Sequence, residues 1–166
     1  MGLLAQELAP KAGAVLPDLL RAYADEWFGH YNYYFVSRTV CGASSTSISA
    51  LLRSKSEASL CRADRLASRI IELGGTPVPK LTELVDAATD KPFKLPDDLG
   101  NVRELLEAVL DAERTSMRTH HLILSKTRDN DPLTAALALD LLREATEGEQ
   151  QLERLLADSV PDKTGT

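Results

Sequence analysis

Apolar residues recur every three or four positions along four long segments of the chain, the spacing that puts side chains on one face of an α-helix. These segments cover residues 16–40, 47–73, 101–126 and 132–158. Turn-forming residues separate them: Cys-Gly-Ala-Ser-Ser-Thr follows the first, Gly-Gly-Thr-Pro follows the second, and Asp131-Pro132 precedes the fourth. Aspartate is a common helix cap, and proline suits the first helical position. The pattern therefore predicts an all-α protein.

The connection between the second and third predicted helices, residues 76–100, is long for a compact domain and rich in proline and aspartate. A helix of about 27 residues is about 40 Å long at 1.5 Å per residue. The connection, which has a helical stretch of its own at 81–88, could run back along that whole length. We therefore expect a four-helix bundle with one long crossover, in which the second and third helices are parallel.

Composition and charge indicate one ordinary globular domain of 166 residues, with 43% hydrophobic and 27% charged residues. We expect an N-terminal extension at 1–14, the bundle at 15–158 and a disordered tail at 159–166. The net charge of −6, with no basic cluster at either end, argues against sequence-independent binding of nucleic acid. The sequence shows no signal peptide and no apolar run long enough to span a membrane, so we expect a cytoplasmic protein.

Polar residues interrupt the apolar stripes of three predicted helices. Glu26 lies on the stripe of the first helix and Glu113 on that of the third, while Ser59 and Arg62 lie three residues apart on the second. A charged group that faces a core is costly unless it is paired or bound to a metal. These positions are therefore candidates for a buried functional site.

Four stretches resemble bacterioferritins and Dps-like ferritins. The strongest is ADRLASRIIELGGTP at 63–77, which resembles the end of their second helix, and EWFGHYNYY at 26–34 resembles their first-helix ligand segment. Glu113-Arg114 and EQQLE at 149–153 resemble parts of the third and fourth helices. The resemblance spans residues 15–157 and implies a ferritin-like fold.

Members of this family with a working di-iron centre use one Glu from each of two helices and a Glu-x-x-His pair from each of the other two. The resemblance places these six positions on Glu26, Ser59, Arg62, Glu113, Ala145 and Gly148. The single glutamates are retained and both pairs are lost. A register one residue later on the fourth helix gives Thr146 and Glu149, still without histidine. Two residual carboxylates cannot fill the coordination shells of two irons.

Arg62 offers a reason why the bundle would survive this loss. Glu26 and Glu113 would repel each other without metal, and a guanidinium between them would leave a formal charge of −1 and offer a fork that suits carboxylates. Ferritin light chains are similar, since they lack the oxidation centre and carry a basic residue in its place. We expect a salt bridge of Glu26, Arg62 and Glu113; the alternative is that Arg62 extends to the surface.

Other polar candidates are weaker. His30 and His120 would lie about 16 Å apart along the bundle axis, which is too far to share a metal. Leu60 stands where bacterioferritins place their haem-ligating Met, so the resemblance argues against haem. Cys41 and Cys61 match no zinc or disulfide spacing. We expect both to be inert free thiols.

The expected function is a ferritin-like shell or scaffold protein, linked to iron storage or stress protection, that lacks a complete ferroxidase centre. One alternative is an active ferritin with a non-standard iron site on Glu26 and Glu113. Another is a bundle that serves as an interaction module without metal. We expect no cofactor and a homo-oligomer, either a dimer or a dodecamer. Larger shells of the family usually carry a fifth helix, and only a polar tail follows Asp158.

Overall fold

The computed structural model describes residues 12–42, 45–78, 80–88 and 96–158, and the expected tail and most of the expected N-terminal extension lie outside them. The described residues form α2 (Ala12–Thr39), α3 (Ser45–Glu72), α4 (Leu81–Ala87), α5 (Val102–Thr127) and α6 (Pro132–Asp158). The predicted all-α fold is confirmed. No helix in this part of the chain is long and apolar enough to cross a membrane.

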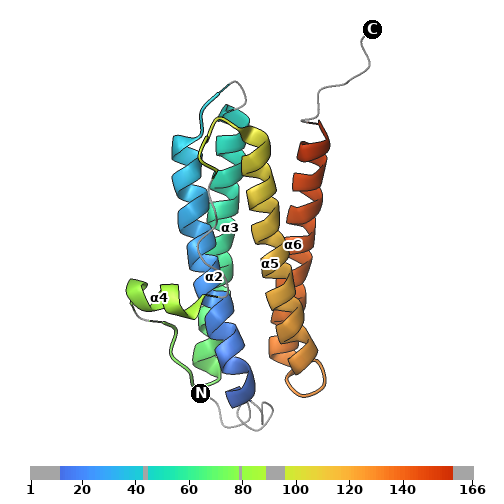
Figure 1. Cartoon of the computed structure of the whole chain (residues 1–166). Helices are drawn as coiled ribbons and strands as arrows, with labels where there is room; N and C mark the ends of the chain where they lie inside the picture. The colour runs from blue at the N-terminus through green and yellow to red at the C-terminus, as the bar shows by residue number, and fades with distance from the viewer. Residues whose placement is uncertain (1–11, 43–44, 79, 89–95, 159–166) are drawn as a thin grey trace.

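The four long helices form a bundle in which α2 packs along α3 and α5 packs along α6 (Figure 1). Helices α3 and α5 run in the same direction, so the segment between them has to cross the length of the bundle (Figure 1). The short helix α4 belongs to this crossover and packs against the flank of α2. The predicted four-helix bundle with a long crossover is confirmed.

Two helix boundaries show where local sequence signals succeeded and where one failed. At the start of α6, Asp131 Oδ1 accepts a hydrogen bond from the Thr134 backbone N–H at 3.1 Å, so the predicted cap is present. By contrast, α2 begins at Ala12 instead of about residue 16, and Pro17 lies inside the helix. Proline is best tolerated near the start of a helix because it lacks a backbone donor, and Pro17 lies in the second turn of α2.

Two apolar clusters fill the bundle interior. One contains Val15, Leu19, Ala22, Leu66, Ile70, Leu73, Ile123, Ala138 and Leu141. The other contains Tyr33, Val36, Ile48, Leu52, Leu105, Leu106, Val109, Leu110 and Leu152. Every long helix contributes to both clusters, so the inward positions between them on each helix meet at one level of the bundle.

That middle level is polar. We call the following buried side chains the polar layer: Glu26, Lys55, Ser59, Arg62, Glu113 and His120. On α6, Gly148 lies beside Glu113 and Lys55 and leaves room for their side chains, and Ala145, three residues earlier, is also buried. The fold therefore brings the polar interruptions of the sequence together in one place.

Candidate functional site

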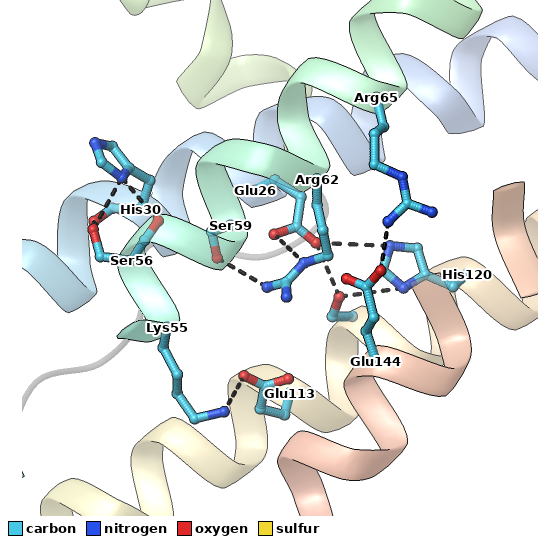
Figure 2. Close-up of polar contacts among 11 residues, drawn as sticks. Glu26, His30, Lys55, Ser56, Ser59, Arg62, Arg65, Glu113, His120 and Glu144 are labelled. Carbon is cyan, nitrogen blue, oxygen red and sulfur yellow. Dashed lines mark hydrogen bonds and ion pairs between the residues drawn. The ribbon is translucent and has the colours of Figure 1, made fainter. Parts of the chain in front are cut away.

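The polar layer contains both glutamates that the family resemblance pointed to. Glu26 extends from α2 and Glu113 from α5, and they are only 4% and 3% exposed (Figure 2). Ser59 and Arg62 reach the same level from α3, and both are buried. The structure thus brings Glu26, Ser59 and Arg62 into contact and places Gly148 beside Glu113. Four of the six expected ligand positions hold residues that are not Glu or His.

Arg62 faces Glu26. Its Nε atom lies 3.0 Å from Glu26 Oε2 in a buried ion pair. Its Nη2 atom donates a hydrogen bond to Ser59 Oγ at 3.0 Å. Because the Arg62 residue is only 7% exposed, its guanidinium lies inside the bundle and does not extend to the surface.

Glu113 has a different partner, which corrects the expected three-residue salt bridge. Lys55 Nζ donates a hydrogen bond to Glu113 Oε1 at 2.8 Å (Figure 2). The layer therefore contains two separate ion pairs, because one guanidinium does not bridge both carboxylates. Lys55 was missed in the sequence although its spacing was informative: it lies three residues after Leu52 and four before Ser59, on the buried stripe of α3.

Two cations balance two carboxylates in this low-dielectric setting. Burial raises the pKa of the Glu26 carboxyl; Arg62 opposes this rise and the charge of Glu113 adds to it. Burial alone would lower the pKa of Arg62, but Glu26 and then Glu113 raise it overall. Burial also raises the pKa of the neighbouring Tyr33 phenol, and the two glutamates raise it further. The charge of Glu113 therefore raises the pKa of both Glu26 and Arg62, even though each carboxylate has its own cation.

His120 is the sixth member of the polar layer, and it lies on α5 beside Glu26 of α2. Its Nε2 atom is 3.7 Å from Glu26 Oε1, and its Nδ1 atom is 3.5 Å from Ser116 Oγ. Burial, and then the charges of Arg62 and Arg65, lower the pKa of His120 to about 3. His30 lies elsewhere, where its Nδ1 atom is 2.9 Å from Ser56 Oγ. The two histidines do not share a site.

These donors do not fit a two-iron centre. Among the described residues, no group of three or more His, Cys, Asp or Glu side chains is placed to hold a metal ion. Ser59 contributes one hydroxyl and Ala145 and Gly148 contribute no donor, while Lys55 and Arg62 place positive charge against the two glutamates. A di-iron site needs carboxylate and imidazole ligands that this set does not supply.

A cavity of about 500 Å³ opens beside the Lys55–Glu113 pair, between α3 and α6. Arg62 and Gly148 also line it. A Cβ atom at position 148 would lie 3.0 Å from Glu113 Oε2 and 3.1 Å from Lys55 Nζ. The glycine therefore leaves space that the buried ion pair uses.

Three other residues singled out in the sequence lie away from this centre. Cys41 and Cys61 are exposed free thiols. Leu60 is 40% exposed on α3. None of them belongs to the polar layer.

Comparison with known proteins agrees with this architecture. A family model described as ferritin-like domain matches residues 18–159. A Pyrococcus furiosus protein described as DNA protection during starvation protein is 29% identical over 142 residues, which cover 86% of this chain and 76% of that protein. The bacterioferritin-related, dodecameric thioferritin of Bacteroides fragilis has a TM-score of 0.87 and 27% identity, over 93% of this chain and 92% of that one. Dps from Thermosynechococcus elongatus, at 18% identity, shares the fold with a TM-score of 0.81 over 98% and 99% of the two chains.

Proposed function

The chain belongs to the ferritin-like family, and from this premise we propose that it is a self-assembling shell or scaffold protein of iron storage or stress protection whose bundle centre is not a complete ferroxidase site. The match of the family model to residues 18–159 supports the shell architecture. The starvation-protection name of the Pyrococcus furiosus relative supports the stress role. In this function iron is a cargo of the assembly.

The polar layer is the observation that carries the second half of the proposal. By the family resemblance, Glu26 and Glu113 correspond to the two single glutamates of a ferritin-like centre, and each forms an ion pair with a side-chain cation. The residues at the other ligand positions cannot replace the missing carboxylates and imidazoles. This favours a structural centre over the alternative of a non-standard iron-oxidising one.

Self-assembly is supported by the apolar surface on the flank of the bundle. Leu81 and Val85, one turn apart on α4, are 78% and 56% exposed. Elsewhere on α2, Tyr31 and Tyr34 are also exposed, at 65% and 53%. Such a surface is suited to a second copy of the chain. We propose a dimer or a dodecamer, and the net charge of −6 makes nucleic acid a poor candidate partner.

Light scattering on the purified protein, with electron microscopy of the same sample, tests the assembly. The expected particle contains two or twelve chains, and a closed particle would retain iron added as cargo. A 24-subunit particle would contradict the proposed size. A monomer would contradict the shell and favour the interaction-module alternative, for which the cavity beside Lys55 and Glu113 would be the first place to look for a ligand.

A further inference from the structure

We infer that Lys55 and Arg62 take the place of the two metal ions of a ferritin-like centre, so that side-chain charge alone holds the middle of this bundle. The inference rests on the proposed function in one respect: it treats Glu26 and Glu113 as the glutamates that other family members use for metal. It adds a cation for Glu113 and a reason for the small residues on α6.

The first support is that the numbers of buried cations and carboxylates match. Lys55 Nζ lies 2.8 Å from Glu113 Oε1, and Arg62 Nε lies 3.0 Å from Glu26 Oε2. Each buried carboxylate thus has its own positive charge at contact distance. An uncompensated buried carboxylate is strongly unfavourable, and a metal ion is one way to avoid it. Here the protein supplies both positive charges itself, so a metal ion would have to displace an ammonium or a guanidinium.

The second support is steric. Ser59 stands at a position where other members carry a ligand, and its Oγ accepts the hydrogen bond from Arg62 Nη2. Gly148 stands at another, and even a Cβ atom there would approach Lys55 Nζ to 3.1 Å. An imidazole at position 148 would occupy the space of the Lys55 ammonium. The small residues at these positions therefore accommodate the cations.

The third support is the direction of Lys55. Long lysine side chains normally extend their ammonium groups into water. The Lys55 side chain is only 10% exposed, although a cavity of about 500 Å³ lies beside it, whereas that of Lys80 is 70% exposed. Because the cavity leaves Lys55 room to turn away, its contact with Glu113 indicates that the carboxylate holds it there.

Thermal unfolding with and without a divalent metal tests the inference. The wild-type protein, Lys55→Ala and the exposed control Lys80→Ala are dialysed against EDTA and melted in EDTA or in millimolar Mn²⁺. The wild type and Lys80→Ala should melt at the same temperature in both buffers. Lys55→Ala should melt lower in EDTA and recover part of the loss in Mn²⁺, because a metal ion can then reach Glu113 through the space that the lysine leaves.

A wild-type midpoint that rises in Mn²⁺ as much as that of Lys55→Ala would overturn the inference, and so would a Lys55→Ala midpoint equal to that of Lys80→Ala. If Lys55→Ala does not fold, the double variant Lys55→Met with Glu113→Gln decides, since it removes both charges and should fold and ignore Mn²⁺. Light scattering of the same samples separates the two proposals. A monomeric wild type would contradict the shell, whereas the melts test whether Lys55 takes the place of a metal ion at Glu113, whatever the particle size.

Discussion

Lys55 Nζ lies 2.8 Å from Glu113 Oε1 in the middle of the bundle, where the two side chains are 10% and 4% exposed. The surface pair Lys80–Glu83 has almost the same separation, 2.7 Å, but its side chains are 70% and 45% exposed. Since the contact distances match, burial is what distinguishes the two pairs. Removing one partner of a buried pair leaves an uncompensated charge, which water cannot stabilise.

Lys55→Met is therefore expected to lower the free energy of unfolding by about 3–5 kcal/mol, because it leaves Glu113 buried without a cation. The control Lys80→Met should change it by only about 0–1 kcal/mol, as for other exposed pairs. Urea melts followed by circular dichroism measure both. Equal effects of the two substitutions would show that Glu113 is solvated in the native protein.

Arg62→Ala is expected to have a similarly large effect, about 3–5 kcal/mol, because Glu26 then loses its ion pair. Changing Glu26→Gln together with Arg62→Leu should recover much of this loss, since no uncompensated charge remains. A matched control is Arg103→Ala, which removes an exposed pair with Glu107 at 2.9 Å. If the free energy of unfolding of Arg62→Ala lies within about 0.5 kcal/mol of that of the parent, the usual range for surface substitutions, the guanidinium does not stabilise Glu26.

Ferrous iron added in air is expected to oxidise no faster with this protein than in buffer. Two irons have to be held by carboxylates and imidazoles close enough to share dioxygen, and Ser59, Ala145 and Gly148 supply none of these ligands. Absorbance of the ferric product over time measures the rate, with bovine serum albumin as a protein control. A saturable rate that depends on this protein would refute the prediction and support a non-standard iron site.

Leu81→Glu with Val85→Glu is expected to reduce the size of the oligomer, because both side chains are exposed apolar groups on one face of α4. Placing charge on a surface that becomes buried in an assembly opposes that burial. Light scattering measures the particle, and circular dichroism checks that the bundle stays folded. The control Leu133→Glu changes a residue on α6 that is 57% exposed. A particle unchanged by the α4 variant but reduced by the control would place the interface on the other side of the bundle.

The sequence predicted the fold well because periodicity over long helices is a strong signal. Glu26 and Glu113 could be found because they lie on otherwise apolar stripes, and the antiparallel neighbours followed from loop length. The start of α2 was less predictable: the apolar stripe predicted a start at about residue 16, whereas the helix begins at Ala12 and passes through Pro17. Local propensity gave way there to packing along the bundle.

The pairing inside the site could not be read from the sequence. Spacing places Lys55 and Arg62 on the same stripe of α3, but it does not say which carboxylate each one reaches. That choice depends on side-chain direction and on the room that Gly148 leaves beside Glu113. The position of His120 beside Glu26 is also a tertiary effect, since it follows from how far α2 and α5 are shifted along each other.

His120 should make the stability of the protein depend on pH. Burial lowers its pKa to about 3 in the folded state, whereas an unfolded histidine has a pKa of 6.5. The unfolded chain therefore binds the extra proton more readily, so this contribution is complete above pH 6.5 and is lost as the pH falls from there towards 3. Between pH 8 and pH 5 the loss should be about 2 kcal/mol.

The test is to compare the parent with His120→Gln by urea unfolding at pH 8, 7, 6 and 5. The substitution changes contacts with Glu26 and Ser116, so its constant offset is not informative. The informative quantity is the difference between the two proteins in the slope of the free energy of unfolding against pH. Groups common to both proteins cancel in that difference. The raised pKa of Glu26 adds stability as the pH falls, the opposite sign, and because Glu26 is present in both proteins this contribution is subtracted in the comparison. The parent should lose about 2 kcal/mol more than the variant over this range, and parallel curves would mean that His120 can be protonated in the folded bundle without cost.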